Sequence, residues 1–283
     1  MENILIWLVL GLFQGVTDVF PISSLGHLAL LRQLLGAQAF DLSLATGLHG
    51  GSFMAIAIFF RKELKTLWIN FTESLSHLKN WIGRKERYLL LSPEGTIPYL
   101  YGFSLIPVAI EGFTLKYIAN EIFNQRYIPL ILLILNGVII LITALVVRGE
   151  RTIKELSWKE FLFIGITQGL AVLPGISRLG LVLCAGLWCR LKWQDALKLT
   201  FVISIPVVFG ALTVEAGDIV SSIEKTPGSL WLFPTSIILA GLCSWFSLKL
   251  LTSRLLERRK LVLFGYYSLM LGSFSLAYLY FWK

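Results

Sequence analysis

The sequence predicts an all-α integral membrane protein with six transmembrane helices and two re-entrant helix pairs in an inverted-topology repeat. Three observations support this fold class: the composition, the charge-poor runs along the chain, and an internal repeat. Of the 283 residues, 56% are hydrophobic and only 15% are charged, and the mean hydropathy is +0.74. Soluble domains are about a quarter charged. The composition therefore indicates a polytopic membrane protein.

Six runs with few charges are long enough to span a bilayer, which takes about 20 helical residues. These runs are Leu42 to Phe60, Thr96 to Ile118, Tyr127 to Val147, Leu199 to Val214, Thr226 to Leu248 and Leu261 to Trp282. Two further apolar regions, Ile4 to Leu35 and Phe161 to Leu191, are broken midway by proline, glycine, serine and charged residues. Broken helices are tolerated at membrane depth only where protein or water surrounds them. We interpret both regions as re-entrant helix pairs.

The two broken regions resemble each other in sequence. The segment GLFQGVTDVFPISSLG from Gly11 aligns without a gap with GITQGLAVLPGISRLG from Gly165, and seven of the sixteen positions are identical. Three predicted spans lie between the copies, so the second copy must enter the membrane from the opposite face. Such inverted repeats bring two broken helices together near the bilayer midplane and place a site between them. We therefore expect one polytopic domain, residues 1–283, with inverted repeats at approximately 4–147 and 158–283.

Basic residues cluster in five segments between the apolar runs, which begin at Arg61, Arg84, Arg148, Arg190 and Arg254. Since cytoplasmic loops are enriched in Lys and Arg, these segments mark the cytoplasmic side of a multi-pass cell-membrane protein. Both termini are then expected at the outer face. The longest excursion, Arg61 to Gly95, has the mixed leucine, tryptophan and basic pattern of a helix lying at the interface, with a solvated loop as the alternative.

The net charge of +8 is carried by these short loop segments, which argues against nucleic-acid binding and for the bilayer as the partner. The three cysteines are odd in number and form no CxxC pair. A disulfide framework or a cysteine metal cluster is therefore not predicted.

Arg178 is the most informative residue for function. A guanidinium inside an apolar region is costly, and its fork of donors suits a phosphate or a carboxylate. The preceding break, PGISR from Pro174, includes Gly175 and Ser177 and offers backbone N–H groups at a helix start, where anions bind. An anion site is the sharper interpretation. The alternative is an Arg178 paired structurally with Asp18 across the repeat interface.

Ser24 and His27 are three residues apart, so on a helix they share a face and could hydrogen-bond. A hydroxyl beside an imidazole is the minimum for nucleophilic attack or water activation, although this spacing also occurs by accident. Asp18 could orient His27, bind a divalent cation, or only neutralise Arg178. The repeat-equivalent residues Gln14 and Gln168 could satisfy backbone groups at the breaks. His49 and Glu111 also lie near or within predicted spans.

The segments QGVTDVFPISSLGH and LPGISR resemble the two motifs of the undecaprenyl pyrophosphate phosphatases, close to (E/Q)GLTE-F-L-P-(I/V)-SS-x-GH and PG-x-SRSG-x-T. The flanking segments GGSFMAIAIFFRKEL and FVISIPVVFGA are also similar to that family. The resemblance implies a membrane enzyme that converts a polyprenyl diphosphate into the monophosphate carrier used in cell-envelope synthesis, and it implies bacitracin resistance. It further implies a divalent cation, Mg or Ca, and a site open to the outer face.

By motif position, the resemblance assigns Ser24 and His27 as nucleophile and base and Gln14 and Asp18 to the acidic motif, with Asp18 as a candidate metal ligand. It assigns phosphate binding to Ser177 and Arg178, and we extend this group of phosphate contacts to Ser23, Gln14 and Gly175.

The chain departs from the family pattern at three positions. Asp18 stands where Glu is usual, and Leu179 and Val182 replace two hydroxyl residues of the second motif. We expect a working site with altered metal or substrate preference.

The alternative function is a transporter or flippase of lipid phosphates or other anions with the same fold and no hydrolysis. A soluble-type lipid phosphatase constellation is set aside, because no histidine follows the SR pair in SRLGLVLCAGLW. A purely structural protein would leave the repeated polar breaks unexplained. The assembly state stays open, with a homodimer among the alternatives.

Overall fold

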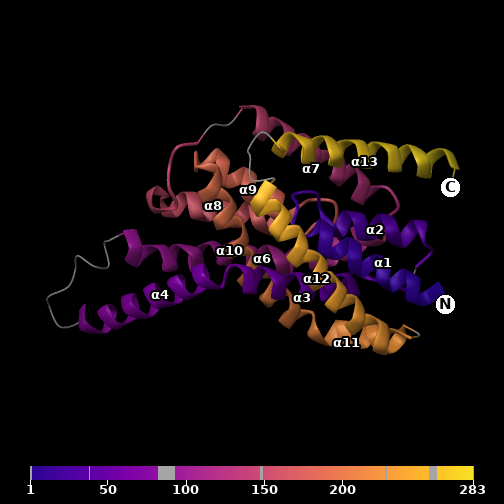
Figure 1. The fold of residues 1–283 in the computed structure, drawn as a ribbon, viewed down its shortest axis with the longest axis horizontal. Coiled ribbons are helices and arrows are strands. Elements are labelled where there is room, and N and C mark those ends of the chain that lie inside the picture. Colours follow the sequence, from indigo (N-terminus) through magenta and orange to yellow (C-terminus); the bar gives the residue numbers. More distant parts are fainter. Residues whose placement is uncertain are drawn as a thin grey trace.

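The computed structural model describes residues 2–37, 39–81, 93–146, 149–226, 228–254 and 260–282. Within these ranges the chain forms twelve α-helices and one short 3-10 helix, η1 (Ile153–Glu155), and no strand (Figure 1). The long helices are α3 (Leu42–Phe59), α4 (Arg61–Trp81), α6 (Pro93–Asn124), α7 (Ile128–Val146), α10 (Trp193–Val214), α12 (Ser229–Arg254) and α13 (Leu261–Trp282). The shorter ones are α1 (Glu2–Thr17), α2 (Ser24–Leu34), α8 (Trp158–Leu170), α9 (Arg178–Trp188) and α11 (Ala216–Lys225).

Six of these helices, α3, α6, α7, α10, α12 and α13, are long and apolar enough to cross a membrane. This confirms the number and the place of the predicted spans. Three of them are longer than expected, because α6 continues to Asn124, α10 already begins at Trp193 and α12 continues to Arg254. The predicted spans end near charged residues, but a charged residue near its end does not terminate a helix. Asp195 in the first turn of α10 even interacts favourably with the helix dipole.

Each of the two broken apolar regions forms two short helices, α1 with α2 and α8 with α9. Both second helices start with the same cap. The hydroxyl of Ser23 accepts the N–H of Gly26 at 3.2 Å, and the repeat-equivalent Ser177 accepts the N–H of Gly180 at 3.0 Å. Serine is a preferred N-cap because its oxygen satisfies an N–H group that has no partner within the helix. The sequence repeat is therefore also a repeat of local structure.

The two helix pairs pack in matching ways. A Cβ on Gly11 of α1 would lie 2.6 Å from the Ser236 carbonyl oxygen of α12, and a Cβ on Gly165 of α8 would overlap the Ser104 carbonyl of α6. Glycine is required at both positions for this close approach. Helices α7 and α13 pack along each other. Figure 1 shows α1 and α2 in the half of the bundle where the N and C labels stand, and α8 and α9 in the other half.

The segment predicted to lie at the interface is helical up to Trp81, which favours the helix over the loop alternative. Helix α4 follows α3 with only Phe60 between them, and it packs beside α6. Of the rest of the predicted segment, residues 82–92 lie outside the described residues and residues 93–95 belong to the first turn of α6.

Candidate functional site

The two helix breaks touch each other in the middle of the molecule. A Cβ on Gly26, in the first turn of α2, would lie 3.0 Å from the Cα of Gly175 in the second break. Asn136, fully buried on α7, joins the breaks from the other side: its amide donates to the Pro21 carbonyl at 3.3 Å, and its carbonyl accepts the Ser177 N–H at 2.9 Å. The starts of α2 and α9 are therefore held together by direct contact and by one shared side chain.

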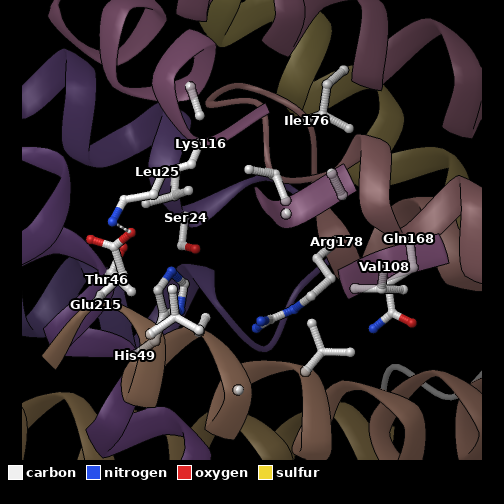
Figure 2. A pocket seen from close by; sticks show the side chains of 18 of the residues that line it. Ser24, Leu25, Thr46, His49, Val108, Lys116, Gln168, Ile176, Arg178 and Glu215 are labelled. Carbon is white, nitrogen blue, oxygen red and sulfur yellow. Dashed lines mark ion pairs between the residues drawn. The ribbon is translucent and has the colours of Figure 1, made fainter. Parts of the chain in front are cut away.

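A cavity of about 340 Å³ opens where these helix starts meet, between α3, α6 and α10 (Figure 2). One part of its lining is polar and includes Asp18, Ser24, His49, Gln168 and Arg178. The walls that α6 and α10 contribute are mostly apolar, with Leu105, Val108, Ala109, Phe113, Pro206, Val207, Ala211 and Val214. A polar floor below apolar walls suits an amphiphilic ligand.

Asp18 is the centre of the polar part. Its Oδ1 accepts a hydrogen bond from the Ser24 hydroxyl at 3.1 Å and lies 3.0 Å from Nδ1 of His49. The guanidinium of Arg178 pairs with the same oxygen at 3.6 Å. The other oxygen, Oδ2, is buried and has no hydrogen-bond partner in the described part of the chain. The ion pair between Asp18 and Arg178, which is the alternative interpretation of Arg178, is present, and Arg178 also lines the cavity.

The expected hydrogen bond between Ser24 and His27 is not formed. The Nδ1 of His27 lies 2.7 Å from the Ser23 carbonyl, and its Nε2 lies 2.9 Å from the hydroxyl of Tyr267 on α13. The ring also stacks on Tyr267 with an interplanar angle of 5°. Sharing a helix face was not sufficient, because Ser24 is the first residue of α2 and turns back to Asp18 in the break. Ser24 and the imidazole of His49 instead both contact Oδ1 of Asp18.

The other expected phosphate contacts divide into two groups. Ser177 lines the cavity, whereas Ser23, Gln14 and Gly175 do not. Ser23 caps α2 and holds its backbone at a φ of 66°, a strained value for a residue with a side chain. Gly175 has a φ of 108° and packs against the backbone of α7 at Pro129. These residues shape the breaks from behind the cavity wall.

Gln14 lies behind the polar part of the cavity, fully buried. Its Nε2 is 2.7 Å from Nδ1 of His49, so it contacts the site through that histidine. Gln14 and Asp18 thus both contact Nδ1 of His49. In the sequence, His49 stands out only as a residue near or within a span. No local sequence pattern could identify His49 as a site residue, because it lies in the middle of the apolar helix α3.

The residues that depart from the family motif occupy different environments. Leu179 lines the cavity, whereas Val182 is fully buried in the core and does not. Only the replacement at Leu179 therefore changes the cavity surface. Glu111, noted in the sequence, does not line the cavity either; its carboxylate packs against Gly169 of α8.

A second set of charges lies at the far end of the cavity, where Lys116 of α6 meets Glu215 at the end of α10. The ammonium group is 3.0 Å from Oε1 of Glu215 and 2.7 Å from Oδ2 of Asp218 on α11. Ser43 of α3 donates to the same glutamate at 3.1 Å. This ionic cluster joins α3, α6, α10 and α11, and Figure 2 shows the pair of Lys116 and Glu215 apart from Arg178.

Together these features define a polytopic α-helical membrane protein with a charged site buried where two broken helices meet. The chain belongs to the family described as Bacitracin resistance protein BacA, whose model matches residues 7–274.

The chain is similar over nearly its whole length to proteins named undecaprenyl-diphosphatase. The protein of Methanosphaera stadtmanae is 34% identical over 277 residues, which cover 96% of each chain. The protein of Methanococcus vannielii is 32% identical over 279 residues, 99% of this chain and all of the relative. The protein of Pelobacter propionicus is 30% identical over 274 residues, 95% of each chain.

Proposed function

We propose that this chain is a membrane phosphatase that hydrolyses a polyprenyl diphosphate, such as undecaprenyl diphosphate, to the monophosphate. The observation that carries the proposal is the cavity, whose polar floor holds Asp18, Ser24, His49 and Arg178 and whose walls are apolar. An anionic head group fits the floor, and the walls of α6 and α10 suit an isoprenoid tail. The family membership and the names of the relatives support the same reaction.

The positive groups at the floor would stabilise the phosphoryl group during transfer. Arg178 is the first residue of α9 and extends into the cavity (Figure 2), and Ser24, the first residue of α2, lines the same cavity. Phosphoryl transfer is catalysed mainly by such positioning and electrostatic stabilisation. Arg178 would move from its pairing with Asp18 toward the phosphate oxygens, which a guanidinium binds through two donors.

Ser24 is the hydroxyl best placed for attack on phosphorus. Its proton is directed at Oδ1 of Asp18, so the carboxylate would accept that proton, with the nearby His49 holding the carboxylate in place. The Ser24 oxygen would bond to the terminal phosphorus as the bond from that phosphorus to the bridging oxygen breaks, and the lipid monophosphate would leave. Water, with Asp18 as its base, would then hydrolyse the phosphoserine, which releases inorganic phosphate and restores the Ser24 hydroxyl. An attacking water bound between Ser24 and Asp18 would use the same carboxylate as its base.

We also propose that a divalent cation, Mg or Ca, binds together with the substrate. Among the residues described, no group of three or more His, Cys, Asp or Glu side chains gathers to hold a metal. The unpartnered Oδ2 of Asp18 fits a single carboxylate ligand. Mg²⁺ is often bound through one or two carboxylates and the phosphates of the substrate, so this donor set suits it. The cation would offset phosphate charge; Asp18 would hold it.

The membrane arrangement is part of the proposal. We propose that the pairs α1–α2 and α8–α9 are re-entrant and enter from opposite faces as an inverted repeat. Their matching serine caps, matching glycine contacts and locations in opposite halves of the bundle support this arrangement. The basic residues of the loops favour termini at the outer face. From the family resemblance we propose that the site opens toward the same face.

The first experiment measures phosphate release from a polyprenyl diphosphate by the purified protein in detergent, with and without Mg or Ca. We expect metal-dependent release and a loss of about 100-fold or more in Ser24→Ala and Arg178→Ala. Arg178→Lys tests whether two donors are needed. If the folded protein binds the lipid but releases no phosphate, hydrolysis is wrong and the transporter alternative, which no observation favours at present, takes its place.

A further inference from the structure

Gln168 on α8 has a buried carboxamide without partners. The residue is 1% exposed and lines the cavity, yet neither Nε2 nor Oε1 has a hydrogen-bond partner in the part of the chain that the structure describes. Burying an unpaired amide costs more free energy than a hydrogen bond returns, so native proteins satisfy nearly all such groups. The carboxamide is therefore a binding group whose partner is not part of the described chain.

The repeat provides an internal comparison. Gln14 stands at the equivalent position of the first broken helix, is equally buried, and places its Nε2 2.7 Å from His49. The two glutamines share sequence context and helix position but differ in surroundings. Gln14 makes a contact within the protein behind the cavity wall, whereas Gln168 lies on the wall and makes none.

Two other polar residues of the cavity lining are unsatisfied in the same way. The Nε of Arg178 and the Oδ2 of Asp18 are both buried and have no hydrogen-bond partner among the described residues. Figure 2 shows Gln168 and Arg178 on the same side of the cavity, apart from the pair of Lys116 and Glu215. Two donor groups, on Gln168 and Arg178, and two acceptors, on Gln168 and Asp18, are thus open in the lining of one cavity.

We propose that Gln168 binds the diphosphate head group directly, an inference that rests on the proposed function. Its Nε2 donates to a phosphate oxygen, and its Oε1 accepts a hydrogen bond from a phosphate hydroxyl or from a water bound with the head group. Oδ2 of Asp18 is the proposed cation ligand, so a bare anion would satisfy the donors but leave Oε1 of Gln168 unpaired. The open Oε1 of Gln168 therefore indicates a protonated or hydrated diphosphate rather than a bare one.

The test compares Gln168→Met, Gln168→Glu and Gln14→Met, using farnesyl diphosphate as the probe in phosphate release and in thermal unfolding in detergent. Methionine keeps the length of the side chain but forms no strong hydrogen bond. We expect Gln168→Met to raise KM about tenfold or more, and Gln168→Glu to raise it further because its carboxylate repels phosphate. The midpoint of unfolding without lipid stays equal or rises in Gln168→Met, because an unpaired polar group has been removed. It falls in Gln14→Met, because His49 loses a partner.

Three outcomes would overturn the inference. The first is a wild-type KM in Gln168→Met. The second is a wild-type gain in thermal stability of this variant when farnesyl diphosphate is added. The third is an unfolding midpoint as low as that of Gln14→Met, which would mean that the carboxamide of Gln168 has a structural role. The proposed function fails separately. If the wild-type protein is stabilised by farnesyl diphosphate but releases no phosphate, and Gln168→Met abolishes that stabilisation, head-group binding by Gln168 stands while hydrolysis falls.

Discussion

The carboxamide oxygen of Asn136 accepts a hydrogen bond from the backbone N–H of Ser177 at 2.9 Å. The same side chain donates to the carbonyl of Pro21 in the other break, so one residue of α7 sets the distance between the two halves of the site. Ser177 directly precedes Arg178, and Pro21 lies three residues before Ser24. The relative position of hydroxyl and guanidinium thus depends on a residue that touches neither.

Replacing Asn136 by Leu should reduce both stability and activity. Leucine is close in size but leaves two buried backbone groups unpaired, at a cost of about 2–4 kcal/mol in total. Thermal unfolding in detergent measures the loss of stability, and phosphate release below the unfolding midpoint measures activity. Asn136→Asp keeps an acceptor for the Ser177 N–H but cannot donate to Pro21, so it should lie between the wild type and Asn136→Leu. Wild-type values for Asn136→Leu would exclude a bridging role.

Sequence patterns were sufficient for the six long apolar helices and for four polar residues of the breaks that line the cavity, Asp18, Ser24, Ser177 and Arg178. Proline, glycine and serine at the breaks predicted where the short helices end and start, and the repeat predicted that the breaks correspond. Asn136 and His49 could not be found this way, because each lies inside an apolar helix and reaches the site only through tertiary packing. The same reason explains the missed contact of His27, whose partner Tyr267 is 240 positions away.

The two histidines at the site should respond differently to mutation. His49 lines the cavity and lies 3.0 Å from Asp18, so His49→Leu should lower phosphate release about 100-fold or more by releasing the catalytic carboxylate. His27 does not line the cavity and contacts the Ser23 carbonyl and the Tyr267 hydroxyl, so we expect it to hold the start of α2. Its replacement by Ala should therefore lower activity and thermal stability together.

Tyr267→Phe is the matched control for His27, since it removes only one hydroxyl partner of that ring. It should reproduce a small part of the His27→Ala effect in both measurements. A fully active His49→Leu beside an inactive but stably folded His27→Ala would mean that His27 works on the substrate, contrary to this geometry.

The start of α8 provides a pH dependence outside the spans. Burial raises the pKa of Glu160. The hydrogen bonds from Arg151 and from the backbone and hydroxyl of Ser157 together lower this pKa by more than burial raises it, so the net pKa lies below its ordinary value. A carboxylate with a lowered folded pKa stabilises the protein above its unfolded pKa, about 4.3, and loses that contribution as pH falls through the folded value. Glu160→Gln should cost about 0.5–1 kcal/mol at pH 7, typical of a pair near the surface.

Thermal unfolding of the wild type and Glu160→Gln across pH 3–7 measures this effect. The difference between the unfolding midpoints of the two proteins should be constant near neutral pH and disappear in acid, because the protonated Glu160 of the wild type can no longer pair with Arg151. Glutamine keeps an acceptor for the Ser157 N–H, so the helix cap survives in the variant. A gap that widens in acid would contradict the assignment.

The route of the lipid tail can be tested at two glycines of the apolar walls. Gly112 on α6 and Gly210 on α10 both line the cavity, and a Cβ added to either meets no atom within 4 Å. A leucine there begins in open space and would extend into the cavity, and replacing a helical glycine gains up to about 0.8–1 kcal/mol of helix propensity. If the tail lies between α6 and α10, Gly210→Leu should raise KM for a long polyprenyl diphosphate and leave hydrolysis of a short-chain one nearly unchanged.

Gly102→Leu separates this effect from helix propensity. Gly102 is also on α6 and also has open space around it, but it does not line the cavity. All three variants should unfold at or above the wild-type temperature in detergent, and only those at Gly112 and Gly210 should discriminate between chain lengths. Because both cavity glycines lie on the apolar walls, a uniform loss on long and short substrates would instead mean that leucine disturbs the polar floor. An unchanged KM for the long lipid in Gly210→Leu would place the tail elsewhere, on a surface that α10 does not form.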